Sequence, residues 1–316
     1  MTITQNSAAP LVAVVGGTGT QGGSVVKALA ESDKAYRVRG LTRDATKPAA
    51  QSLVAQGVEL AIVEIGVQNK EAVSKAFSGA NAVFLVTAFV HHGDPARETA
   101  EGKMMIDAAK AAGVERIVWS GLPAVKKLSG GVVQNLLNFD SKAAVTEYGF
   151  QSGVPFVNVQ AGFFDTNFLG WAAPRKKDDG SFVIQLALRP TTSLPMIYTE
   201  EDYGLYVLRA LEAPVFPNGS EILTGEYITV EDIVRQLAEA TGKRITFEQI
   251  SSEQLGKDLS VKRPPPVVAT FVDAMRWFDE FGYYGGAPAS SLEGLRRTPK
   301  SWIEFCKTAD WSKFLS

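Results

Sequence analysis

Short runs of apolar residues alternate with segments of helical character through the first half of the chain. The runs are rich in Val, Ile and Phe and nearly continuous, as expected for parallel strands covered by helices on both faces. Segments between them, such as Ser24–Ala30, Lys70–Phe77 and Glu98–Ala112, predict helices. The alternation predicts an α/β fold built on a doubly wound parallel sheet. Its predicted strands are Leu11–Val15, Tyr36–Leu41, Val58–Val63, Ala82–Thr87, Arg116–Ser120 and Pro155–Gln160.

After Ala161 this alternation breaks, which predicts a domain boundary at residue 160. We expect residues 1–160 to form a nucleotide-binding domain and residues 161–316 a smaller α+β domain. The two would form a cleft and exchange some segments. The second part has predicted strands Phe182–Leu188, Met196–Thr199, Glu221–Leu223 and Arg244–Ile250, and predicted helices Glu200–Leu211, Glu231–Thr241 and Val267–Phe281.

Composition narrows the possible chemistry. The 316 residues are 45% hydrophobic and 21% charged, with a formal net charge of −2, which argues against a nucleic-acid surface. Cys306 is the one cysteine, and His91 and His92 are the two histidines. An intramolecular disulfide and a zinc site with several Cys and His ligands are therefore excluded, whereas a carboxylate site for a hard cation stays open. With no basic signal segment and no apolar run of about 18 residues, we expect a cytoplasmic protein without membrane contact, with the nucleus as an alternative compartment.

A glycine-rich turn follows the first predicted strand and leads into a predicted helix. An early glycine permits a tight turn, a middle one lets the backbone approach a pyrophosphate, and a last one lets the helix pack on the strand. The context, a first strand–helix junction in a βαβ series, favours a dinucleotide site over a turn with no ligand. The residues of this turn are Gly16, Gly17, Thr18, Gly19, Thr20, Gln21 and Gly22.

The end of the second predicted strand indicates which dinucleotide binds. An NAD site places an acidic residue there for the ribose 2′-hydroxyl, but Asp44 lies beyond the strand. Arg43 stands at the strand end, with Lys47 four residues later. Because a guanidinium and an ammonium suit a 2′-phosphate, we expect NADP(H). The alternative is that both are ordinary surface cations.

Reductases of this fold commonly use Tyr-x-x-x-Lys, in which the lysine lowers the tyrosine pKa for proton donation. None of the eight tyrosines precedes a lysine in this way, and Asn138 stands four residues before Lys142. Lys142 therefore fits a contact to the cofactor ribose better than a general acid. Ser120 has the place of a catalytic serine, although a serine at a strand end also often bonds the backbone.

Other residues allow two interpretations. His91 and His92 are either solvated or a pocket acid and base. Phe271, Met275 and Phe278 have the spacing of one helix face and predict core packing rather than a ligand wall. Residues 281–286, rich in aromatic residues and glycine, predict a flexible lid.

Through several segments the chain resembles the NmrA-like family, an atypical branch of the short-chain dehydrogenase/reductases. It is also similar to a human NADPH-sensing member in lacking a tyrosine before its lysine. After the third strand relatives carry Gly-Asp-Leu, where this chain has residues 65–67 as Ile-Gly-Val, which implies a looser hold on the adenine. The matching segments are Val15–Gly23, Leu41–Arg43, Ala82–Thr87, Val118–Leu122, Phe139–Lys142, Gly162–Phe168, Leu223–Glu226 and Thr298–Trp302.

This resemblance implies a Rossmann-type domain for NADP(H) and a smaller second domain. It assigns the phosphate loop to Gly16–Gly22 and the 2′-phosphate contacts to Arg43 and Lys47. Some members reduce small molecules and others only bind the cofactor. The resemblance places Thr87, Ala88, Phe89 and Lys142 on the nicotinamide side, under a closing loop that contains Gln160, Gly162 and Phe163.

Two hypotheses for function follow. The first is a regulatory protein that senses NADP(H) and acts on a protein partner; a complete dinucleotide site beside an incomplete set of proton donors favours it. The alternative is an NADPH-dependent reductase of a small apolar carbonyl, alkene or imine, with Lys142, a histidine or water as the proton source. Either is expected to be a monomer or homodimer without nucleic-acid or membrane partners.

Overall fold

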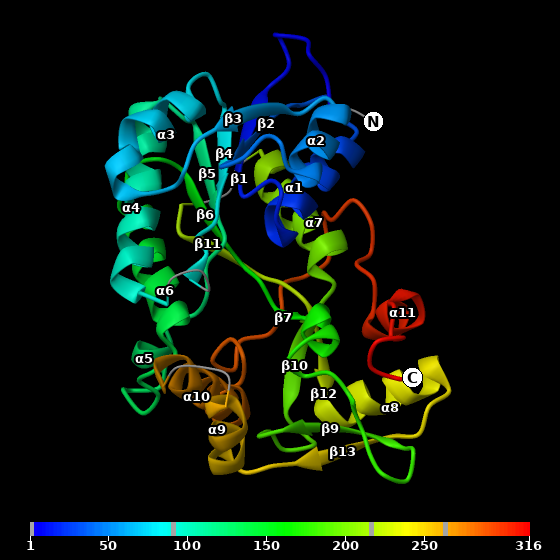
Figure 1. Cartoon of the computed structure of the whole chain (residues 1–316). Coiled ribbons are helices and arrows are strands. Elements are labelled where there is room, and N and C mark those ends of the chain that lie inside the picture. Colours follow the sequence, from blue (N-terminus) through cyan, green and yellow to red (C-terminus); the bar gives the residue numbers. More distant parts are fainter. Residues whose placement is uncertain (1–2, 90–92, 215–217, 262–264) are drawn as a thin grey trace.

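A seven-stranded parallel sheet forms the centre of the upper half of the molecule (Figure 1). The computed structural model describes residues 3–89, 93–214, 218–261 and 265–316. The strand order is β11-β6-β5-β4-β1-β2-β3, so the sequence of strands reverses between β1 and β4. The doubly wound α/β fold is confirmed. Its strands are β1 Leu11–Val15, β2 Arg37–Thr42, β3 Glu59–Ile62, β4 Ala82–Leu85, β5 Arg116–Trp119, β6 Phe156–Gln160 and β11 Ser220–Leu223.

Helices cover both faces of this sheet, and each face has its own apolar core. One face carries α3, α4 and α6, and the other carries α1, α2 and α7 (Figure 1). The sheet is therefore buried on both sides, which explains why its strands are continuous apolar runs. The bounds are α1 Thr20–Glu31, α2 Pro48–Ala55, α3 Lys70–Phe77 after the short η1 Val67–Asn69, α4 Pro95–Ala111, α6 Leu137–Phe150 and α7 Thr199–Glu212.

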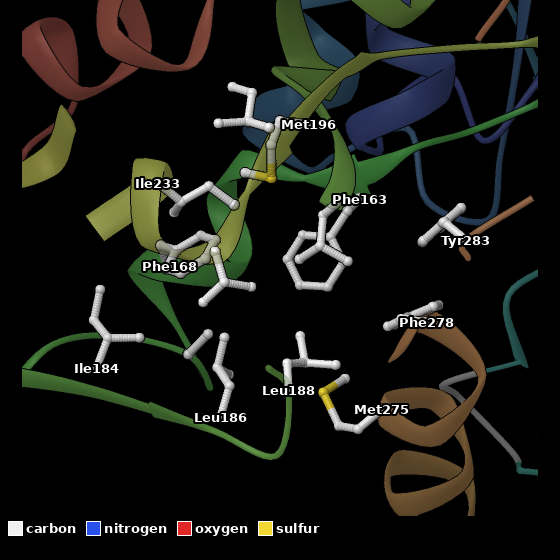
Figure 2. Close-up of a cluster of buried hydrophobic side chains, with 14 of the residues drawn as sticks. Phe163, Phe168, Ile184, Leu186, Leu188, Met196, Ile233, Met275, Phe278 and Tyr283 are labelled. Atoms are coloured by element: carbon white, nitrogen blue, oxygen red, sulfur yellow. The ribbon is translucent and has the colours of Figure 1, made fainter. Parts of the chain in front are cut away.

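The lower half of the molecule is a smaller α+β unit with two three-stranded sheets, β12-β10-β7 and β13-β9-β8. Aromatic and aliphatic side chains from both sheets and from α10 meet in its core (Figure 2). Its strands are β7 Phe163–Phe164, β8 Arg175–Lys176, β9 Phe182–Leu186, β10 Ser193–Ile197, β12 Glu226–Thr229 and β13 Ile245–Gln249. Its helices are η3 Asp165–Leu169, α8 Val230–Thr241, α9 Ser252–Ser260, α10 Pro265–Glu280 and α11 Trp302–Thr308, and α5 Val125–Leu128 lies beside α10.

Two segments from the second half of the chain belong to the upper layers. β11 pairs with β6 at the edge of the large sheet, and α7 packs on α1. The packing of α7 is so close that a Cβ on Gly204 would lie 2.0 Å from the Ser24 carbonyl oxygen. These two segments come from the second half of the chain and pack with the first. The division into a domain of residues 1–160 and a domain of residues 161–316 stays a prediction.

Aromatic residues after α10 are packed rather than mobile. Tyr283 and Tyr284 are buried, and the Tyr283 ring stacks on Phe278 with centroids 4.8 Å apart. The predicted lid over residues 281–286 is therefore wrong, because both rings are packed in the core, where Figure 2 shows Tyr283. Met275 and Phe278 are buried as predicted, whereas Phe271 is half-buried against Trp171.

In the part of the chain that the structure describes, no helix is both long enough and apolar enough to cross a membrane.

Candidate dinucleotide site

The glycine-rich turn connects β1 to α1 at the carboxyl edge of the sheet. Gly16 has φ of +67°, a left-handed conformation that glycine adopts without a Cβ clash. A Cβ on Gly22 would lie 2.2 Å from the Gly16 carbonyl oxygen, so the helix approaches the turn only because Gly22 has no side chain. These two glycines permit the tight turn and the close helix contact that the motif requires.

The N-terminus of α1 is exposed and has no side-chain cap among the described residues. Its N-cap is Gly19, whose carbonyl accepts the first helical hydrogen bond from Gly23 at 2.7 Å. In the described part of the chain no side chain caps this end, and the first turn has no acidic residue. Thr18, Gly19 and Thr20 are exposed. The N–H groups and the positive end of the helix dipole therefore face solvent, which fits a pyrophosphate.

Arg43 and Lys47 lie just beyond β2 and are exposed. Asp44, the acidic residue nearest this strand end, is engaged locally: its Oδ1 accepts hydrogen bonds from the Thr46 backbone N–H at 2.9 Å and the Thr46 hydroxyl at 2.6 Å. These bonds hold the pKa of Asp44 below its usual range. The surface beyond β2 thus presents the cations Arg43 and Lys47, while the Asp44 carboxylate is hydrogen-bonded within its own turn.

Ser120 follows β5 and is buried. Its hydroxyl oxygen accepts a hydrogen bond from the Gln21 side chain at 2.7 Å and also interacts with the Tyr203 hydroxyl. Tyr203 on α7 donates to the Val159 carbonyl at 2.9 Å. Ser120 therefore joins the first turn of α1 to α7, an arrangement that corresponds to a structural role.

Lys142 on α6 is buried, and its ammonium donates to Glu98, a side chain that is completely buried on α4. The Glu98 carboxylate also accepts hydrogen bonds from the hydroxyls of Thr87, at 2.7 Å, and Ser141. Burial lowers the pKa of Lys142, and the Glu98 carboxylate opposes this shift. The Glu98 carboxylate thus connects the segment after β4 to the first half of α6 through hydrogen bonds.

Sequence reasoning missed Glu98, although the local packing explains it. α4 and α6 approach closely at Gly102, where a Cβ would lie 2.5 Å from Val145. Glu98 stands one turn before Gly102, and Lys142 nearly one turn before Val145, so the close approach brings the two charges together. A glutamate at the head of the buried stripe Gly102, Met105 and Ala109 was the available signal.

The other residues that the resemblance assigns to the nicotinamide side follow Thr87 in the sequence. Ala88 is exposed and Phe89 half-buried, while His91 and His92 fall outside the described residues. Asn138 precedes Lys142 by one helical turn, and its buried Oδ1 has no hydrogen-bond partner among the described residues. Asn138 therefore presents a polar atom that protein groups do not satisfy.

The end of β6 is braced by buried hydrogen bonds. The Gln160 carbonyl accepts from the Tyr284 hydroxyl at 3.2 Å, and the Gly162 N–H donates to the Thr224 hydroxyl at 2.9 Å. Phe163 points into the lower core with Phe168 and Phe278 (Figure 2). The Phe163 ring is therefore part of the lower core, and the role in a closing loop that the resemblance implies for Gln160, Gly162 and Phe163 stays a prediction.

Comparison with known proteins agrees with this architecture. The model of the NmrA-like family matches residues 9–315. The chain belongs to the NmrA-like family. Among curated relatives, the NmrA-like oxidoreductase malD of Malbranchea aurantiaca is 33% identical over 77% of this chain and 76% of its own length. The NAD(P)H azoreductase of Xenophilus azovorans is 27% identical over 94% and 97%, respectively.

The same fold occurs in NmrA, a negative transcriptional regulator that has been solved in complex with NAD and with NADP. These structures match with TM-scores of 0.80 and 0.79, at 22% identity and 97% coverage of each chain. This NmrA-like chain thus has curated relatives named as oxidoreductases and a structural neighbour that is a regulator.

Asp165 is a second buried carboxyl of this NmrA-like chain. It begins η3 with both carboxylate oxygens lacking hydrogen-bond partners among the described side chains. Burial, and secondarily the negative charge of Asp202, raises the pKa of Asp165 well above its usual range. The folded protein therefore holds a proton that the unfolded chain releases as pH rises.

We expect Asp165→Asn to stabilise the protein, and to do so more at pH 8 than at pH 5. The folded pKa is raised, so the stability linked to Asp165 is complete below pH of about 4 and is lost as pH rises toward the folded pKa. The gain should reach about 1–3 kcal/mol at pH 8. Urea unfolding at both pH values measures it. The exposed Asp310→Asn, whose native pKa is lowered by bonds to Ser312, should show no such gain; an equal gain would contradict the assignment.

Proposed function

We propose that this protein binds NADP(H) across the turn between β1 and α1. The observation that carries this proposal is the uncapped N-terminus of α1, which packs closely against the turn because Gly22 contacts the Gly16 backbone. Its N–H groups would hold the pyrophosphate, and Arg43 and Lys47 the 2′-phosphate. The complexes of NmrA with NAD and NADP support the cofactor class, and the engaged carboxylate of Asp44 supports NADP(H) over NAD(H).

We propose further that the bound cofactor serves regulation. The set of proton donors on which a reductase would draw is reduced. Asn138 stands where such reductases have a tyrosine, one donor of the Lys142 ammonium is held by Glu98, and the Ser120 hydroxyl oxygen accepts from Gln21. α1 is also joined to the second half of the chain through the Ser24–Gly204 contact. A regulatory role requires two conformations of the protein. NADPH must bind one of them more tightly than the other, and NADP⁺ must differ from NADPH in this preference.

A second candidate is an NADPH-dependent reductase, favoured by the names of malD and the azoreductase. NADPH supplies a hydride when bound. The side chains of this chain would then orient the cofactor, with Lys142 as a hydrogen-bond donor near the reacting carbon and water completing protonation. The substrate class is a small apolar carbonyl, alkene, imine or, by similarity to the azoreductase, an azo compound.

Two measurements test these proposals. Calorimetric titration should show NADPH binding; no binding at millimolar concentration would overturn the cofactor proposal. Hydrogen exchange with NADPH and with NADP⁺ should then differ in α7 for a regulator. NADPH oxidation with any member of a panel of quinones, imines, enones and azo dyes, at rates well above the protein-free reaction, would instead establish the reductase.

Arg43→Ala should weaken NADPH binding by about 10- to 100-fold and leave NADH binding within about twofold. The reason is that a guanidinium–phosphate contact contributes roughly 1.5–3 kcal/mol, and NADH has no 2′-phosphate. Arg235→Ala, an exposed arginine on α8, is the matched control and should leave both affinities unchanged. Equal losses for the two cofactors would remove Arg43 from the 2′-phosphate site.

A further inference from the structure

The buried charges between α4 and α6 are the feature from which we infer a new role. Glu98 is 0% exposed and Lys142 is 8% exposed, so this pair lies almost entirely out of water. Lysine and glutamate are rarely buried to this extent, and an unpaired one would cost far more than a pair. The pair lies beside the carboxyl end of β4, where Thr87 bonds the same carboxylate. The resemblance to the NmrA-like family implies that this is the nicotinamide side of the dinucleotide site proposed above.

We propose that Glu98 is a positioning residue for the cofactor site: its carboxylate holds Lys142 as a charged hydrogen-bond donor and fixes the end of β4 through Thr87. The proposal rests on the proposed NADP(H) site. An ammonium has three donors, and one of them donates to Glu98. Among the described residues this is the one hydrogen bond that Nζ donates, and the other two donors would bond cofactor oxygens.

The charge of Lys142 depends on Glu98 because few other groups act on it. Among the described residues, the side chains that meet at this carboxylate are Thr87 and Ser141 beside Lys142, and the one charge that acts on Lys142 is that of Glu98. Burial favours the neutral amine, and Glu98 favours the ammonium. Replacing Glu98 by glutamine leaves burial in place and removes the opposing charge, so Lys142 should lose its proton at a lower pH.

The experiment measures NADPH affinity between pH 7 and 9, a range above the ionisation of the 2′-phosphate near pH 6. We expect wild-type affinity to vary less than about threefold over this range, and that of Glu98→Gln to fall about 10-fold or more as Lys142 becomes neutral. The double variant Glu98→Gln/Lys142→Met has no lysine to titrate and should bind weakly with a flat profile. Tyr148→Phe is the matched control: it removes a hydroxyl that donates to the Asp107 carboxylate between the same two helices at 2.6 Å, outside the proposed site, and should keep the wild-type profile.

A second readout needs neither NADPH binding nor a folded variant. In wild-type protein labelled with ¹³C at lysine Cε, the buried Lys142 resonance should be that of an ammonium at pH 7. A neutral amine at pH 7 would overturn the proposal, as would parallel NADPH profiles for wild type and Glu98→Gln. If NADPH does not bind at all, the proposed function fails while the lysine titration still tests the Glu98–Lys142 pair.

Discussion

Gly22→Ala is expected to destabilise the protein by about 3 kcal/mol and to abolish measurable NADPH binding at micromolar concentration. A Cβ at this position would lie 2.2 Å from the Gly16 oxygen and 2.8 Å from the Gly17 nitrogen, both backbone atoms. Neither can move without opening the turn. The N-terminus of α1 must then shift away from β1, which takes its N–H groups out of line with a pyrophosphate.

The neighbouring Gly23→Ala is the matched control for this prediction. Its Cβ would meet the Gly17 carbonyl at 3.5 Å, an ordinary van der Waals contact. Alanine is also favoured over glycine inside a helix by about 1 kcal/mol, so this variant should be neutral or slightly stabilised and should bind NADPH normally. Thermal unfolding and calorimetric titration of the pair decide the matter. Similar behaviour of the two variants would show that the close approach of Gly22 is not what shapes the site.

The first half of the fold follows from local signals. All six predicted strands of the large sheet are present, and the helix predicted over Lys70–Phe77 has those bounds in the structure. The signals are strong because a parallel sheet covered on both faces requires continuous apolar runs, and glycines mark the tight turn after β1. Arg43 and Lys47 also lie on the surface beyond β2, where their sequence positions predict them.

Longer-range features were not predictable in the same way. β11 joins the large sheet from residues 220–223, and no local pattern specifies that distant pairing. The aromatic segment around Tyr283 and Tyr284 has the composition of a flexible loop, yet its hydroxyls bond carbonyls at the end of β6. Glu98 has the appearance of a surface helix residue until the packing of α4 on α6 buries it. In each case tertiary contacts override the local signal.

Lys142→Met is expected to cost about 3–5 kcal/mol of unfolding free energy, because it leaves the Glu98 carboxylate buried without its countercharge. The two remaining hydroxyl donors, Thr87 and Ser141, do not neutralise that charge. The double variant Glu98→Gln/Lys142→Met removes both charges and should recover to within about 1 kcal/mol of wild type. A urea-unfolding double-mutant cycle at pH 7 therefore should show strong coupling between the two positions.

An exposed ion pair on the neighbouring helices provides the comparison. Lys127 and Glu147 lie 3.6 Å apart with both side chains largely in solvent, so Lys127→Met should cost less than about 0.5 kcal/mol. If Lys142→Met costs no more than Lys127→Met, the buried pair cannot be holding α4 and α6 together. Conversely, a large loss that the double variant does not recover would indicate that Lys142 packs through its aliphatic stem rather than through its charge. Only recovery in the double variant assigns the stability to the paired charges themselves.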